Sequence, residues 1–148
     1  MKSEPDVFSI DDFERERTTG WEGVRNYEAR NTMRDLMRPG EPVLFYHSNA
    51  KPSGIAGLGK IEGPPIPDPT QFDPRSEYYD PASTSATPRW QMVRVEFVEK
   101  FSAVLTLELL KTQKALNGMA LLQKGQRLSV QPVLRKHFEA VLKLAKRR

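Results

Sequence analysis

The pattern of hydrophobic and polar positions predicts short strands interleaved with helices. Two nearly continuous apolar runs predict buried strands, and a strict polar–apolar alternation further along predicts an amphipathic strand. Together with two shorter apolar stretches, the expected strands are 7–10, 42–47, 54–61, 90–101 and 127–131. The second buried strand contains three glycines, which are tolerated where the backbone must bend or another group must approach closely.

Helical spacing and capping residues predict four helices. Ser9, with Asp12 three residues later, predicts the start of a brief helix. Asn26 is the expected N-cap of a helix over 27–37, whose apolar stripe includes Leu36 and whose other side carries Arg30, Arg34 and Arg38. Thr106 predicts a third helix to about Leu116, and a last helix carries an apolar stripe from Leu134 to Ala145 and a basic end at 143–148.

A proline-rich segment separates the second and third long strands. Residues 63–89 contain seven of the twelve prolines, together with Phe72, Tyr78 and Tyr79. A free linker seldom carries such aromatics. We therefore expect this segment to wrap over the surface, pinned by its aromatic side chains, and not to mark a domain boundary.

The order of elements predicts an α+β fold, a mixed and curved sheet or small barrel flanked by helices. At 148 residues we expect one domain, 1–148. Cysteine is absent, which excludes disulfides, Cys-based zinc sites and Cys nucleophiles. The N-terminus is polar and no apolar run is long enough to span a bilayer, so we expect a soluble, cytoplasmic protein that does not contact membranes.

Positive charge gathers in the last third of the chain. The net charge is +4, but ten Lys or Arg against two acids from Val104 to Arg148 give +8 there, whereas thirteen basic against seventeen acidic residues leave −4 elsewhere. A basic region of this kind favours contact with an anionic polymer, of which nucleic acid is the usual one.

Metal and covalent chemistry have little support in the motifs. The two imidazoles, His47 and His137, lack a metal-binding spacing, and no nucleophile elbow or phosphate-binding glycine loop is present. The carboxylates of the proline-rich segment, Asp68 and Asp80 among them, are expected to be solvated. We expect no catalytic residue, no metal and no cofactor.

The segment from Gly20 to Asn31 contains the parts of a base-reading site. It combines Trp21 and Tyr27, whose rings can stack, with Asn26, whose amide can read a base edge, and with Arg25 and Arg30, whose guanidinium groups can bind phosphate. Further candidates lie at predicted strand ends or on the basic helix face: Arg34, Tyr46, Ser48, Asn49, Trp90, Arg127 and Ser129. Core packing is the alternative for the aromatics, and we favour it for Trp90 but not for Trp21.

The chain also resembles the EVE domain family, almost from end to end. The blocks that carry the resemblance are Ser3-Glu4-Pro5, 21–31, 45–49, 54–57, Phe72-Asp73-Pro74, 78–81, Pro88-Arg89-Trp90 and 127–133. The resemblance implies a PUA-like fold, a mixed sheet closing toward a pseudo-barrel. It also implies binding of RNA or DNA, with modified cytosine as the proposed target of such domains. By this resemblance Trp21, Asn26, Tyr27, Ser48 and Ser129 would line the pocket, with Arg25 and Arg30 near the phosphates.

These observations lead us to expect a binding module for nucleic acid that reads a modified base and is not an enzyme. Trp21 would form one wall of an open slot, Asn26 and Ser48 would read the base edge, and Arg34 and Arg127 would add phosphate contacts. Two alternatives stay open: an enzyme acting on nucleotides or RNA, with His47 as its candidate residue, or a module for small ligands or protein partners. DNA or RNA, the modification and the oligomeric state are left undecided.

Overall fold

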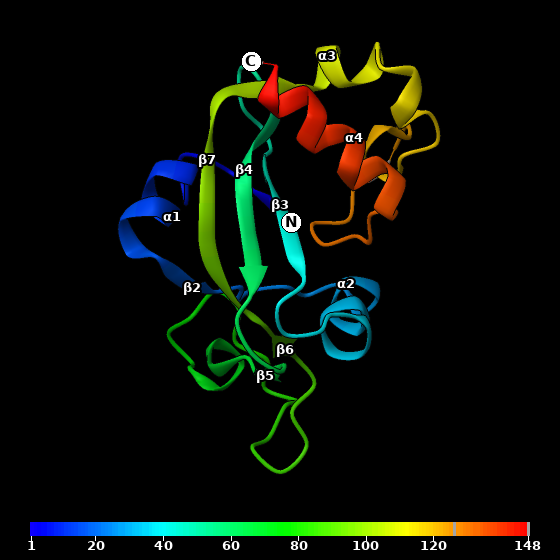
Figure 1. Ribbon diagram of the computed structural model, residues 1–148. Coiled ribbons are helices and arrows are strands. Elements are labelled where there is room, and N and C mark those ends of the chain that lie inside the picture. Colours follow the sequence, from blue (N-terminus) through cyan, green and yellow to red (C-terminus); the bar gives the residue numbers. More distant parts are fainter. Residues whose placement is uncertain (126, 148) are drawn as a thin grey trace.

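A five-stranded mixed sheet organises the molecule (Figure 1). The computed structural model describes residues 1–125 and 127–147. Strand order is β1-β3-β4-β7-β2, with β1 parallel to β3 and the other pairs antiparallel. The strands are β1 (Lys2–Ser3), β2 (Thr18–Gly20), β3 (Pro42–His47), β4 (Gly54–Ile61) and β7 (Arg94–Thr106), and a separate pair is formed by β5 (Ile66–Pro67) and β6 (Gln91–Met92).

Helices cover both faces of the curved sheet, with α1 on one side and α4 on the other (Figure 1). The α-helices are α1 (Ile10–Glu16), α2 (Tyr27–Asn31), α3 (Leu107–Lys111) and α4 (Arg135–Lys146). A π-helical turn, η1 (Thr32–Leu36), continues α2, and short 3₁₀ turns are η2 (Pro69–Phe72), η3 (Lys114–Leu116) and η4 (Ala120–Leu122).

Two hydrophobic cores result, one on each face. Along β3, Val43 and Phe45 join the core under α1 and α2, whereas Leu44 and Tyr46 join the core under α3 and α4. This division follows from the two-residue period of a strand, which sends alternate side chains to opposite faces. A strand buried on both faces has to be apolar along its length, which is why 42–47 reads as an unbroken apolar run.

Local capping chemistry confirms the predicted starts of the first three helices. Ser9 accepts a hydrogen bond from the Asp12 amide while the Asp12 carboxylate accepts one from Ser9, a complete capping box. The Asn26 and Thr106 side chains each accept the backbone N–H three residues later. Arg148, part of the predicted basic end of the last helix, lies outside the described residues.

Several details of the expected pattern are wrong. The third helix ends at Lys111 and not near Leu116, and the strand expected over 90–101 is divided into β6 and β7, of which β7 continues to Thr106. Residues 7–9 are not a strand, because Ser9 caps α1, and the N-terminal strand is Lys2–Ser3. Residues 127–131 are also not a strand, although the Ser129 carbonyl accepts the Lys2 N–H. Leu36 is 60% exposed, because the wider π-helical turn carries its side chain off the apolar stripe that Ala29 and Met33 form in the core.

Buried polar groups hold the proline-rich segment to the fold. Of the three aromatic side chains expected to pin it, Phe72 is half-buried and Tyr78 and Tyr79 are exposed, whereas Gln71 is fully buried. The Gln71 amide donates to the carbonyls of Asp68 and Trp90, and its oxygen accepts the N–H groups of Arg89 and Trp90. Because every polar atom of this side chain is satisfied, it joins two distant ends of an irregular segment at little desolvation cost.

Gly57 lies at an irregularity in the pairing of β4 with β3 and β7, as expected for a glycine where the backbone bends. A Cβ there would meet the Glu99 carbonyl oxygen and would come within 2.6 Å of Ile10 Cδ1. We predict that Gly57→Ala lowers the free energy of unfolding by about 1–3 kcal/mol, measured by urea denaturation. Gly63→Ala is the control, because nothing lies within 4 Å of its Cβ position; equal effects of the two changes would contradict the prediction.

Candidate nucleic-acid interface

The start of α2 brings several of the predicted site residues together. Asn26 caps the helix, with its Oδ1 accepting the Ala29 N–H at 3.1 Å. This cap sets the helical phase that buries Ala29 and leaves Tyr27 52% exposed. Since the same amide oxygen already serves the helix, the Asn26 NH₂ group is the part of the side chain that suits a ligand contact.

Trp21 lies in the hydrophobic core and is only 9% exposed. Its ring packs edge-on against Phe45, with centroids 5.8 Å apart and an interplanar angle of 87°. Its backbone N–H donates to the Val93 carbonyl, which extends the pairing of β2 with the neighbouring strand. The expectation of an open indole wall is therefore wrong, because Trp21 closes the core under α1 and α2.

Trp90, in contrast, supports an aromatic surface at α2. Its ring is buried, as predicted, and stacks on Tyr27 with centroids 4.9 Å apart and an interplanar angle of 23°. The Trp90 Nε1–H donates to Asp80 at 2.8 Å, and Arg30 lies over the Tyr27 ring with its Cζ 4.6 Å from the centroid. We call Trp90, Tyr27 and Arg30 the α2 column. It places an exposed aromatic and a cation side by side, an arrangement suited to a nucleobase.

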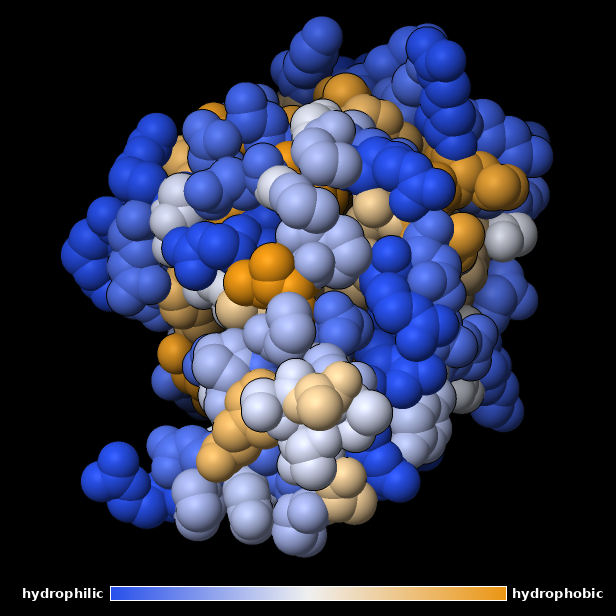
Figure 2. Space-filling view, turned by 90° about the horizontal axis from the view of Figure 1, so that it is seen from below, coloured by the Kyte–Doolittle hydropathy of each residue, from blue (hydrophilic) through white to orange (hydrophobic). Residues whose placement is uncertain are grey.

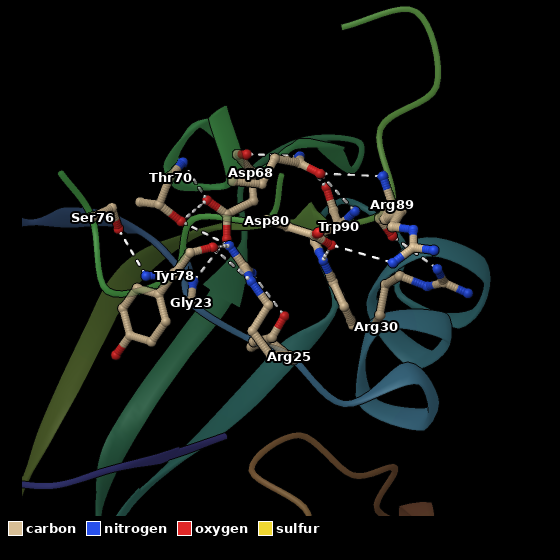
Figure 3. Close-up of polar contacts among 12 residues, drawn as sticks. Gly23, Arg25, Arg30, Asp68, Thr70, Ser76, Tyr78, Asp80, Arg89 and Trp90 are labelled. Atoms are coloured by element: carbon tan, nitrogen blue, oxygen red, sulfur yellow. Dashed lines mark hydrogen bonds and ion pairs between the residues drawn. The ribbon is translucent and has the colours of Figure 1, made fainter. Parts of the chain in front are cut away.

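Arg25 holds the protein's own loops together (Figure 3). Its Nε and Nη2 donate to the Tyr78 carbonyl, Nη2 also donates to Thr70, and Nη1 donates to the Val24 carbonyl and Asp68. These contacts use all five N–H groups of the guanidinium. The prediction that Arg25 contacts phosphate is therefore wrong.

Asp68 is the fully buried partner of this arginine, although the sequence pattern indicated a solvated carboxylate. Its oxygens also accept the Gly23 N–H at 2.7 Å, and the Thr70 N–H and hydroxyl at 2.8 and 2.6 Å. Burial alone would raise the pKa of Asp68, but the hydrogen bonds from Thr70, Gly23 and Arg25 outweigh it and lower the pKa below 3.8. The Asp-Pro pair at the start of η2 is a cap signal that could have revealed this residue.

The remaining polar candidates gather beside β1. Ser48 is half-buried and its N–H donates to the Ser3 carbonyl, while the exposed Asn49 donates to Glu4. Ser129 is tied to β1 through its carbonyl. Tyr46 is 7% exposed, and burial raises the pKa of its hydroxyl. These candidates therefore lie around β1, and their part in one site with Tyr27 and Asn26 stays a prediction.

The last two predicted phosphate contacts are exposed. Arg34 pairs with Asp35 at 2.8 Å on η1, and Arg127 lies on the surface of the segment before α4. Figure 2 shows the side of the molecule that carries the proline-rich segment, where hydrophilic residues dominate and hydrophobic ones form small separate patches. Such a surface suits a polar, charged partner better than an apolar one.

A groove of about 710 Å³ lies elsewhere, between η1, the start of β3 and α4. Apolar side chains such as Leu36, Val133 and Phe138 line most of it, and none of the predicted site residues does. The sequence feature that corresponds to this groove is the set of apolar side chains exposed on η1 and before α4, namely Leu36, Val133 and Leu134.

His47, the residue considered for catalysis, serves the fold. It is 9% exposed, and its Nε2 accepts the Ile10 backbone N–H at 3.0 Å. Burial lowers the pKa of its imidazole, and a neutral ring is the form that can accept this bond. In residues 1–125 and 127–147 no group of three or more His, Asp or Glu is placed to hold a metal ion, and no helix there is long and apolar enough to cross a membrane.

Comparison with known proteins gives consistent matches over the whole chain. Human thymocyte nuclear protein 1 is 44% identical over 97% of this chain and 72% of its own length. A crystal structure of a Pseudomonas syringae protein is 47% identical, with a TM-score of 0.93 over 98% of this chain and 97% of that one. A crystal structure of the human THYN1 protein in complex with 5-methylcytosine-containing DNA is 42% identical, with a TM-score of 0.91 over 100% of this chain and 96% of that one.

The family assignment agrees with the fold. The curled mixed sheet flanked by helices is the PUA-like α+β fold that the sequence blocks implied, and it is shared with the human thymocyte nuclear protein 1 domain at a TM-score of 0.91. Residues 1–144 match the family described as the EVE domain. The chain belongs to the EVE domain family.

Proposed function

We propose that this protein binds nucleic acid and reads a modified base, with modified cytosine in DNA as the first candidate. The observation that carries the proposal is the likeness, over the full length of this chain, to the human protein whose structure contains 5-methylcytosine DNA. The α2 column adds local support, because an exposed aromatic with a cation packed against it is a surface on which a base can stack.

The roles of individual residues follow from their exposure. Tyr27 and the Asn26 NH₂ group are accessible to a base, and Trp21 would contribute as a buried floor rather than as a wall. Arg34 and Arg127 are the exposed cations for phosphate contact. The polar group beside β1, formed by Tyr46, Ser48, Asn49 and Ser129, would supply further hydrogen bonds to the ligand. This role is one of binding, without catalysis.

Titration of matched oligonucleotides tests the proposal. Fluorescence anisotropy would compare DNA of one sequence carrying 5-methylcytosine, cytosine or another modified base, each at several salt concentrations. We expect the preferred modified base to strengthen binding about tenfold, in the range of one good base contact. Tyr27→Ala should remove this preference, whereas Arg127→Gln should weaken binding to all sequences alike and reduce the salt slope by about one.

The contrary result is equally clear. Binding that depends on salt alone, with no difference between modified and unmodified DNA or RNA and no effect of Tyr27→Ala, would refute base reading. Failure to bind any of the oligonucleotides at low salt would refute the nucleic-acid proposal as a whole.

A further inference from the structure

We propose that the Arg30 guanidinium is a stacking platform for an unpaired nucleobase next to the base that is read; this inference rests on the proposed function. The geometry assigns Arg30 a different task from that of a phosphate contact. Stacking on Arg30 also requires an unpaired base, because a base inside a duplex has both faces covered by its neighbours and cannot stack on a side chain.

The Arg30 guanidinium is fixed in its plane by hydrogen bonds. Its Nε and Nη2 both donate to Asn31 Oδ1, at 3.1 and 2.8 Å, and its Nη1 donates to the Arg89 carbonyl at 2.8 Å. Donors of a guanidinium lie in its plane, so these bonds set the orientation of the flat face. Three of its five N–H groups are therefore committed to the protein, which leaves a reduced edge for phosphate.

This guanidinium packs on an aromatic pair. Its Cζ lies 4.6 Å from the Tyr27 ring centroid and 5.9 Å from that of Trp90, and the two rings stack on each other at 4.9 Å. Trp90 is anchored from the side by its Nε1–H bond to Asp80. Figure 3 shows Arg30 beside α2, at the margin of the cluster that Asp68 and Arg25 form.

The Arg30 guanidinium is ordered before any ligand binds. Arg30 remains partly exposed. The three hydrogen bonds that hold its guanidinium use acceptors of the protein itself, so they form without a ligand. Guanidinium planes stack on unpaired bases in the same way as aromatic rings do. A platform held in place beforehand loses little side-chain entropy when a base arrives.

Charge-conserving substitution separates stacking from phosphate contact. The probe is a short oligodeoxynucleotide with one 5-methylcytosine and a fluorescent 2-aminopurine as its neighbour, left unpaired. We expect Arg30→Lys, which keeps the charge but removes the plane, to weaken binding about tenfold and to reduce the quenching of 2-aminopurine. The salt slope should stay near its wild-type value. Asn31→Ala removes the acceptor of two hydrogen bonds but keeps the Arg30 side chain, so it should weaken binding and quenching in the same direction by a smaller factor.

A substitution of another arginine, Arg15, is the control for this experiment. Arg15→Lys changes an exposed arginine on α1 that pairs with Asp12, and it should change neither binding nor quenching. If Arg30→Lys binds and quenches like the wild type, and only Arg30→Gln weakens binding with a salt slope reduced by about one, Arg30 contacts phosphate and the inference fails while the proposed function stands. If the wild type binds no oligonucleotide, the proposed function itself fails. Circular dichroism of each variant checks that it is folded.

Discussion

Replacing Asp68 with alanine should lower the free energy of unfolding by about 3–5 kcal/mol, the range for breaking a buried ion pair by removing one partner. Asp68 is fully buried and accepts hydrogen bonds from Gly23, Arg25 and two groups of Thr70. Without it, the Arg25 guanidinium keeps only carbonyl and hydroxyl acceptors, and the Gly23 N–H loses its acceptor. Urea denaturation at neutral pH measures the change.

A surface ion pair provides the matched control for Asp68. Glu139 pairs with Arg135 at 3.1 Å along α4, and both side chains are more than half exposed. Glu139→Gln should therefore cost no more than about 0.5 kcal/mol. If the Asp68 and Glu139 variants lose similar amounts, Asp68 is not the anchor that its contacts indicate.

The effect of Asp68 should also depend on pH in a defined direction. Burial favours the protonated form, but the hydrogen bonds win and lower the pKa of Asp68 below 3.8. A carboxyl whose pKa is lower in the folded state stabilises the protein above its unfolded pKa, and this contribution is lost as pH falls through the folded value. The difference between wild type and Asp68→Ala should thus be full at neutral pH and shrink below about pH 3.8, as measured by denaturation at a series of pH values.

Trp21→Ala should lower the free energy of unfolding by about 3–5 kcal/mol, as expected for truncation of a large buried aromatic. The ring fills space against Phe45 at the centre of one core, and that core also contains Phe13 and Phe97. The cavity left by the change cannot close fully, because the surrounding rings are held by their own strands and helix. Thermal and urea denaturation together measure the loss.

Tyr79→Ala is the corresponding control, since this aromatic is 41% exposed in the proline-rich segment. Its truncation should change stability by no more than about 0.5 kcal/mol. A stability loss for Trp21→Ala that is no larger than the Tyr79 effect would restore the open-wall interpretation. Trp21→Phe should recover part of the stability, because most of the packing volume is retained.

The two predictions share one structural cause, the loop from Gly20 to Asn26. Trp21 anchors it to the core, and Asp68 anchors it through Gly23 and Arg25 to the proline-rich segment. The loop in turn delivers Asn26 to its capping position and Tyr27 to the α2 column. Stability of this loop and the geometry of the proposed interface are therefore coupled, so binding by either variant should be measured well below its unfolding temperature.

Signals that lie within a few residues of one another predicted the fold well. Ser9, Asn26 and Thr106 cap helices because the donor and the acceptor are three residues apart, a relation that can be read directly from the chain. The buried strands followed from apolar runs, and the close approach at Gly57 from the glycines of β4. The family blocks added the PUA-like arrangement, which local periodicity alone left open.

Roles that depend on distant partners were assigned wrongly. Arg25 and Asp68 are 43 positions apart, so neither the filled guanidinium nor the buried carboxylate has a local signature. Trp21 has the same difficulty, since a tryptophan in a loop flanked by Gly20 and Gly23 resembles a ligand contact until Phe45 is placed against it. The contacts of Ser48 with Ser3 and of Asn49 with Glu4 likewise join segments 45 positions apart.

The chain by itself determined the two long buried strands and the capped helix starts, the chemistries that are absent for lack of cysteine, and the place where charge concentrates, because each depends on composition or on neighbours along the backbone. Only the tertiary structure decided which arginine is fully hydrogen-bonded within the protein and which is accessible to a ligand. Arg25 and Arg30 stand five positions apart beside the same aromatic, Trp90. Arg25 has all its N–H groups satisfied by the protein, whereas Arg30 lies over the exposed Tyr27 ring. The physical reason is that a side chain's function depends on which hydrogen-bond acceptors folding brings to it, and these come from segments far away in the sequence.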